Sequence, residues 1–96
     1  MRLHVRPEAE LDIYEAALWY DGESLGLGGD FLEKIRRTLR RIEESPLQFP
    51  VVSSDIRRAI LQKFPFGIFF VLEDQRPIVV AVMHLHRHSS TWEGRR

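Results

Sequence analysis

The spacing of apolar residues changes once along the chain, near Pro50, and this change most constrains the fold. Before Pro50 apolar side chains recur every three or four residues, which is the period of an α-helix. After Pro50 they alternate or run continuously, as they do in β-strands. A chain of 96 residues forms one domain, residues 1–96, with a single two-layer core. The sequence therefore predicts an α+β protein in which the helices precede most of the sheet.

The first half predicts a short strand followed by two helices. Leu3 and Val5 alternate with polar residues, and Pro7 then starts a helix that runs to about Asp21. The apolar residues of this helix form two stripes, the first Leu11, Tyr14 and Leu18 and the second Ile13, Ala16, Ala17 and Tyr20. Two stripes predict burial against two neighbours.

The glycine-rich segment 22–29 predicts a turn between the helices. It does not resemble a phosphate-binding loop, because it follows a helix and lacks a Lys-Ser/Thr pair. Asp30 and Glu33 predict a capping box for a second helix, which ends at Ser45-Pro46. Its apolar stripe is Phe31, Ile35, Leu39 and Ile42, and a basic ridge of Lys34, Arg37, Arg40 and Arg41 lies opposite. Such a ridge is either a solvated face or an anion-binding surface.

The second half predicts three strands at 57–64, 66–72 and 78–86, with a tight reversal at 73–77. Strict alternation would place His84, His86 and His88 on one face of the last strand, together with Ile78, Val80 and Val82. The predicted order is β-α-α-β-β-β, a two-helix hairpin packed on one face of a small, largely antiparallel sheet. The other face is then left open, and we expect another molecule to cover it.

Charge and composition limit the function. The chain carries 14 basic and 14 acidic residues, but residues 51–96 have 7 basic against 4 acidic, so an anionic partner should meet the second half. The absence of cysteine excludes a disulfide scaffold and a thiolate zinc site, and we expect neither a metal nor a cofactor. We see no membrane span and no signal peptide, and expect an intracellular, cytoplasmic protein.

Several segments, in this order, resemble the RelE/ParE superfamily of toxins from bacterial type II toxin-antitoxin systems, often labelled plasmid stabilisation proteins. They are Ala9, Asp12, Glu15 and Ala16 with Trp19 and Tyr20; Leu25 to Gly28 with Phe31 and Leu32; Pro46, Phe49 and Pro50; Arg57 to Ala59, Leu61 and Lys63 to Phe70; and Val80 to His84 with Arg87, Trp92 and Arg95. The resemblance implies the layout derived above from periodicity. It also implies an antitoxin protein as partner, a toxin-antitoxin hetero-oligomer, and growth inhibition when the toxin is free.

The resemblance leaves two targets open. RelE-like members are metal-independent endoribonucleases that cut mRNA on the ribosome, and the candidate catalytic residues for that reaction are His84, Arg87, Arg58 and Lys63. ParE-like members poison DNA gyrase without chemistry of their own. The tail lacks the tyrosine common in the cleaving branch, and the net charge is zero, so the gyrase interpretation is slightly favoured. A non-toxic interaction module is the third alternative.

Residues that would bind the target or the antitoxin are Arg57, Arg58, Lys63, His86, His88 and Trp92. Each also has a structural alternative. Arg57 and Arg58 would pair with the first helix or with Asp55, and His84 would be a hydrogen-bonded residue at the edge of the core. Trp92 would pack against the sheet. A metal on the three C-terminal histidines is disfavoured, since no further ligand is evident.

Overall fold

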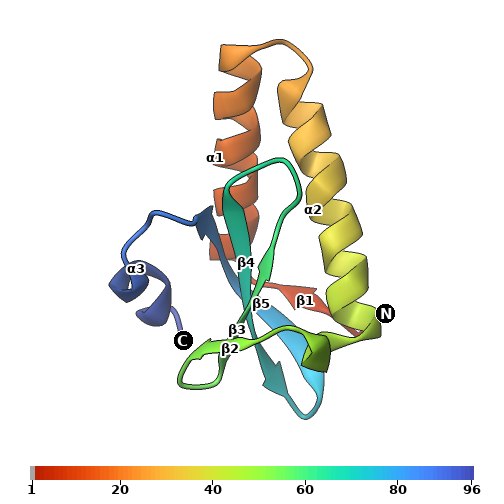
Figure 1. Ribbon diagram of the computed structural model, residues 1–96, viewed down its shortest axis with the longest axis vertical. Coiled ribbons are helices and arrows are strands. Elements are labelled where there is room, and N and C mark those ends of the chain that lie inside the picture. The colour runs from red at the N-terminus through yellow and green to blue at the C-terminus, as the bar shows by residue number, and fades with distance from the viewer. Residues whose placement is uncertain (1) are drawn as a thin grey trace.

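A five-stranded sheet with a helical hairpin on one face forms the body of the molecule (Figure 1). The computed structural model describes residues 2–96. Its elements are β1 (His4–Val5), α1 (Pro7–Glu23), α2 (Leu27–Glu44), the 3₁₀ turn η1 (Pro46–Gln48), β2 (Val51–Ser53), β3 (Ile56–Ile60), β4 (Phe66–Glu73), β5 (Arg76–His84) and α3 (Ser89–Glu93). The strand order is β1-β5-β4-β3-β2, and only the β1–β5 pairing is parallel within the described residues. The predicted α+β class and element order are confirmed, with β2 and α3 as additional short elements.

The two helices form a hairpin that extends beyond one end of the sheet (Figure 1). Gly26 makes the turn with a φ of 91°, a conformation that glycine adopts without strain. A Cβ on Gly28 would lie 2.4 Å from the Ala17 carbonyl oxygen, so glycine is what lets the helices approach. The Gly28 N–H donates to the Asp21 carboxylate at 2.7 Å. Because the turn is completed at Gly26, α2 begins at Leu27 and not at Asp30, and the predicted capping box is wrong.

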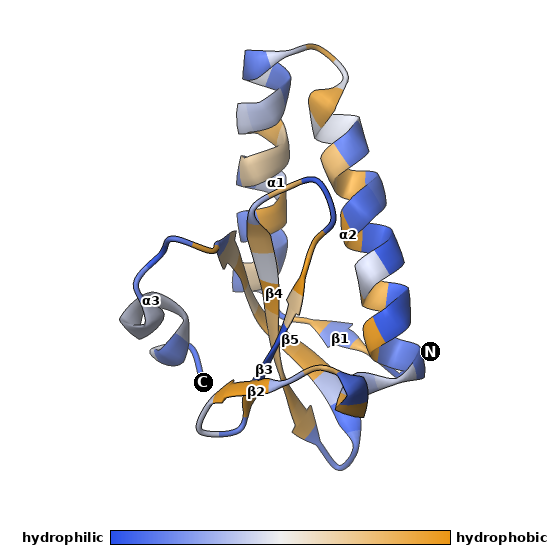
Figure 2. Ribbon diagram, in the orientation of Figure 1, coloured by the Kyte–Doolittle hydropathy of each residue, from blue (hydrophilic) through white to orange (hydrophobic). Residues whose placement is uncertain are grey.

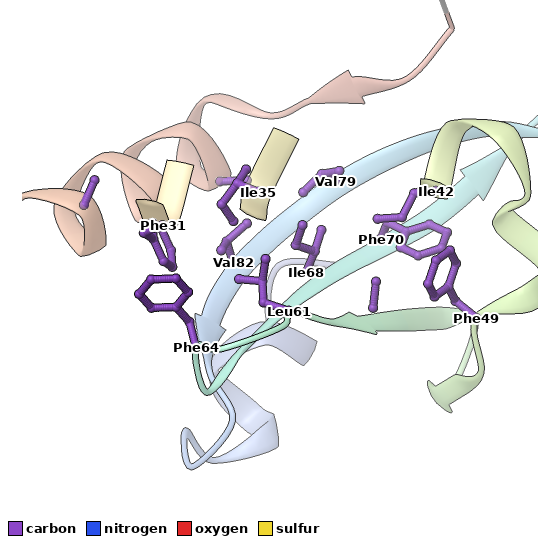
Figure 3. Close-up of a cluster of buried hydrophobic side chains, with 13 residues drawn as sticks. Phe31, Ile35, Ile42, Phe49, Leu61, Phe64, Ile68, Phe70, Val79 and Val82 are labelled. Atoms are coloured by element: carbon purple, nitrogen blue, oxygen red, sulfur yellow. The ribbon is translucent and has the colours of Figure 1, made fainter. Parts of the chain in front are cut away.

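The main core fills the space between the hairpin and the sheet (Figure 3). Phe31, Ile35 and Ile42 project from α2 and are at most 3% exposed. They meet side chains from the sheet and the β3–β4 loop, among them Leu61, Phe64, Ile68, Phe70, Val79 and Val82. The Phe31 ring lies 5.3 Å from Phe64 and 5.1 Å from Phe66, both nearly edge-to-face, which is a favourable aromatic geometry.

A β-bulge in β5 changes which residues share a face. Phe69 pairs with Ala81 and Phe70 with Val79, so Val80 has no partner on β4. A bulge places two residues opposite one and shifts the alternation beyond it. Val82 therefore faces the helices with Val79, whereas Val80 and Ala81 both face away. The prediction that Ile78, Val80 and Val82 share one face is wrong for this reason.

The second face of the sheet is covered by the chain's own C-terminal segment. Trp92 of α3 stacks on Phe69 with the ring centroids 4.4 Å apart. It closes a second apolar cluster, whose other buried members are Ile56, Val71, Ile78, Val80, Ala81 and Met83. In Figure 2 the central strands β4 and β5 are largely orange, as expected for strands buried on both faces. The expectation of an open sheet face is therefore wrong, because residues 89–96 fold back over it.

Only one of the two predicted stripes of α1 is buried. Ala9 and Ala17 are buried, and Ile13, Ala16 and Tyr20 pack against the main core. Leu11, Tyr14 and Leu18 are 56%, 65% and 61% exposed. The prediction of two neighbours is confirmed, since α1 packs against both α2 and β5. Both meet the same side of α1, so the second stripe stays uncovered within the described residues. Neither long helix is apolar over a length that could cross a membrane, as far as residues 2–96 are concerned.

Candidate functional site

A cleft of about 410 Å³ lies between α1 and the C-terminal half of β5. Strand β1 pairs only with Ile78 and Val79, so the edge of β5 beyond them faces this cleft without a neighbouring strand in the described chain. The lining residues are Asp12, Glu15, Ala16 and Trp19 from α1, Phe66, Val82, Met83 and His84 from the sheet, and Arg87 and Arg95 from the C-terminal segment. The cleft therefore joins α1 to residues in the second half of the chain that are distant from it in sequence.

A bidentate ion pair between Asp12 and Arg95 forms part of the cleft wall. Arg95 Nη1 lies 2.6 Å from Asp12 Oδ2, and Nη2 lies 3.1 Å from Oδ1. The Val82 N–H donates to Asp12 Oδ2 at 3.0 Å, and Arg95 Nη1 donates to the Val80 carbonyl at 3.3 Å. The two side chains, 12% and 26% exposed, thus satisfy backbone groups at the open edge of β5 beside the bulge.

Two of the four predicted catalytic residues, His84 and Arg87, line this cleft. The His84 ring lies 5.5 Å from the Phe66 ring, and its Nδ1 accepts a hydrogen bond from the His86 N–H at 3.1 Å. The imidazole is thereby held by its neighbours while it faces the cleft.

The three C-terminal histidines do not share a strand face. Strand β5 ends at His84, so His86 and His88 lie in the turn that leads to α3. His88 is the residue before α3, and its Nδ1 accepts from the Ser90 N–H at 3.2 Å, which caps that helix. The expected alignment of the three rings along one strand face is therefore wrong.

The other predicted cationic residues lie outside the cleft. Lys63 is an exposed residue of the β3–β4 loop, with a φ of 72°. Arg57 donates from Nη1 to the Phe49 carbonyl at 2.7 Å. Neither lines the cleft with His84 and Arg87.

Arg58 lies on the face of the sheet that α3 covers. The aliphatic part of its side chain lies over Gly67, and a Cβ on Gly67 would lie 3.1 Å from the Arg58 Cγ. Its Nε is buried and has no hydrogen-bond partner within residues 2–96. His84 contacts Phe66, which packs against the core on the helical side. Arg58 and His84 are therefore separated by the sheet itself.

The C-terminal residues are held by further polar contacts. Arg96 donates to both Asp55 oxygens, from Nε at 2.6 Å and from Nη2 at 2.5 Å. This hydrogen bonding lowers the pKa of Asp55. Asp55 is thus occupied by Arg96 and not by Arg57 or Arg58. Trp92 is only 6% exposed, because it packs against Phe69 of the sheet.

Sequence reasoning did not assign a role to Asp12, Arg95 or Trp19, which the structure brings to the cleft. Asp12 and Arg95 are 83 positions apart, and no local spacing connects them. Within residues 2–96 no three histidine or carboxylate side chains are grouped so that they could hold a metal ion. The cleft offers instead an imidazole, guanidinium groups and an exposed indole, which bind by charge, hydrogen bonding and stacking.

The arrangement of a helical hairpin on a largely antiparallel sheet is the fold expected for the RelE/ParE type. Among solved structures, the chain is similar to one described as "Chromosomal ParDE TA system from P. aeruginosa", with a TM-score of 0.78 and 15% identity over 88% of this chain and 95% of that chain. At this identity the likeness establishes a shared fold. No protein-family model and no curated protein sequence matches the chain.

Proposed function

We propose that the chain is the toxin of a type II toxin-antitoxin pair and inhibits growth when it is free of its antitoxin. Two observations support this proposal. The fold is similar over nearly its whole length to a chain of a ParDE TA system. The sequence segments that resemble RelE/ParE toxins include Asp12, Trp19 and Arg95, which meet at one cleft. On this proposal the partner is an antitoxin protein, and the two form a hetero-oligomer in the cytoplasm.

The favoured target is DNA gyrase, bound without chemistry by the toxin, as in the ParE-like branch. The separation of the candidate nuclease groups carries this choice. RNA cleavage needs a base, an acid and cations around one phosphate. Here His84 and Arg87 line the cleft, Arg58 lies on the opposite face of the sheet, and Lys63 lies in a loop. A poison that acts by binding requires no such convergence.

The second candidate function is a RelE-like endoribonuclease, and the placement of His84 with Arg87 in one cleft favours it. In that reaction a 2′-hydroxyl attacks the neighbouring phosphate, the P–O5′ bond breaks, and the departing 5′-oxygen takes a proton from solvent. His84 would accept the 2′-proton, and Arg87 would stabilise the charge on the phosphorane. Residues in the turn after β5 would bind the RNA backbone.

Inducing the chain alone in bacteria tests the proposal. Growth arrest with filamentation and a DNA-damage response is the expected result. Purified chain should then inhibit supercoiling by gyrase in vitro. Arrest with cleaved transcripts and intact supercoiling would replace gyrase poisoning by the nuclease function, and normal growth at high expression would remove both.

Two variants separate binding from chemistry. His84→Ala with Arg87→Ala should leave gyrase inhibition largely unchanged if the protein binds gyrase through a surface outside this cleft. If the chain is a nuclease, the same change should abolish transcript cleavage while circular dichroism reports an intact fold. Arg36→Ala is the matched control, because Arg36 is an exposed arginine of α2 that pairs with Glu33 and lies outside the cleft.

A further inference from the structure

The outer face of α1 is an apolar surface that nothing in residues 2–96 covers. Leu11, Tyr14 and Leu18 follow one another at three and four residues, so they form one stripe along the helix. Each is more than half exposed, whereas Ala9 and Ala17 on the opposite side are buried. Large apolar side chains gathered in one exposed strip mark an interaction surface more often than scattered ones do.

Further exposed apolar residues lie near both ends of α1. At its N-terminal end, Leu11 and Tyr14 line a shallow hollow of about 490 Å³ together with Pro7, Glu10 and Ile13. Beyond its C-terminal end, Leu25 is 96% exposed at the tip of the hairpin. The hairpin tip stands clear of the sheet (Figure 1), so a partner can reach the turn between the helices without meeting the strands.

The strip has acidic residues along it and no basic ones. Glu8, Glu10, Glu15 and Glu23 are exposed, and α1 contains no lysine or arginine. The other two carboxylates of the helix are already engaged, Asp12 by Arg95 and Asp21 by the Gly28 N–H. The four exposed glutamates have no ion pair or side-chain hydrogen bond in residues 2–96. The negative charge of these glutamates therefore favours a partner that carries positive charge where it covers Leu11, Tyr14 and Leu18.

We propose that the outer face of α1 binds a basic amphipathic segment of another protein. Its apolar side chains would cover Leu11, Tyr14 and Leu18, and its lysines or arginines would meet the glutamates on either side. A symmetric dimer through α1 does not fit, because two α1 faces would bring two sets of unpaired carboxylates together. An anionic lipid surface is repelled for the same reason. The inference stands on α1 alone and does not depend on the toxin assignment.

Two synthetic peptides test the charge requirement. Both carry leucines at helical spacing, and they differ only in having lysine or glutamate at every flanking position. We expect the purified chain to bind the fluorescently labelled lysine peptide about tenfold more tightly than the glutamate peptide in anisotropy titrations. The affinity should fall as salt rises, because the glutamates are exposed to solvent. Equal binding of both peptides, or no binding of either, would overturn the proposal.

Paired variants test the location. Leu11→Gln with Leu18→Gln should weaken lysine-peptide binding by about tenfold and leave the fold intact, since both side chains are exposed. Leu47→Gln is the matched control, because Leu47 is 70% exposed in η1, outside α1, and should not change binding. An unchanged affinity in the double variant would overturn the proposal. So would sedimentation showing a dimer that the double variant dissociates. Growth arrest is measured separately, so these results are independent of whether the chain is a toxin.

Discussion

The two faces of the sheet are buried to a similar degree but are covered by different means. On one face two long helices contribute a continuous apolar layer, with Phe31 and Ile42 fully buried. On the other face the five-residue helix α3 contributes mainly Trp92, and ion pairs of Arg95 and Arg96 hold the segment in place. The α1–α2 hairpin is part of the main core of the fold, whereas the C-terminal segment 89–96 is a short element held by polar contacts. We therefore expect the first to fail by global unfolding and the second by local opening.

The largest effect is expected on the helical side. Phe31→Ala removes the ring at the centre of the aromatic cluster with Tyr20, Phe64 and Phe66. We expect the free energy of unfolding to fall by about 3–5 kcal/mol, the range for deleting a buried aromatic side chain. Urea denaturation followed by circular dichroism measures this loss. A loss below about 1 kcal/mol would mean that the hairpin is not the principal cover of the sheet.

A smaller global effect is expected on the other side. Trp92→Ala leaves Phe69 without its stacking partner and should cost about 2–3 kcal/mol, below the usual range because α3 can detach on its own. Amide hydrogen exchange should rise in residues 89–96 and along the second apolar cluster, while the helical hairpin stays protected. Equal loss of protection on both faces would contradict the distinction between them.

The difference between the faces also explains what the sequence predicts. Helix positions follow from local spacing, so the stripe of Phe31, Ile35 and Ile42 is enough to identify the side of α2 that faces the core. The cover on the other face depends on Trp92 and on contacts between residues far apart in the chain. Arg95 meets Asp12, and Arg96 meets Asp55 41 positions away. No periodicity records such pairings.

The residues of the candidate site also differ in how far the sequence predicts their positions. His84 and Arg87, which the resemblance groups as catalytic candidates, are close in sequence and line one cleft. The resemblance groups Arg58 with them as a catalytic candidate. The alternation of β3 instead turns its side chain to the opposite face, toward Gly67. The bulge at Val80 has no sequence signal of its own, so strict alternation assigns the residues beyond it to the wrong faces.

Substitution of Asp12 tests whether its ion pair with Arg95 holds the C-terminal segment against the sheet. Asp12→Ala leaves the Arg95 guanidinium and the Val82 N–H without their acceptor in a partly buried setting. We expect a loss of about 2 kcal/mol in thermal denaturation, because unpaired polar groups are costly where solvent is largely excluded. Glu10→Ala is the control, since Glu10 is an exposed carboxylate of the same helix. If both variants lose the same stability, the ion pair is not what holds the C-terminal segment.

The smallest effect is expected at the exposed end of the same segment, and its sign depends on pH. Hydrogen bonding from Arg96 lowers the pKa of Asp55 below its ordinary value of 3.8 in the folded protein. The folded state is therefore favoured above that ordinary value, and the gain disappears as the pH falls through the lowered pKa. Asp55→Asn should reduce the Tm slightly at neutral pH and have no effect well below pH 3.8. Salt should shrink the difference at neutral pH, because both groups face solvent. If the difference in Tm between the wild type and Asp55→Asn grew in acid, Asp55 would act through its packing and not through its charge. The ion pair of Asp12 with Arg95 would then be the charged contact that holds the C-terminal segment.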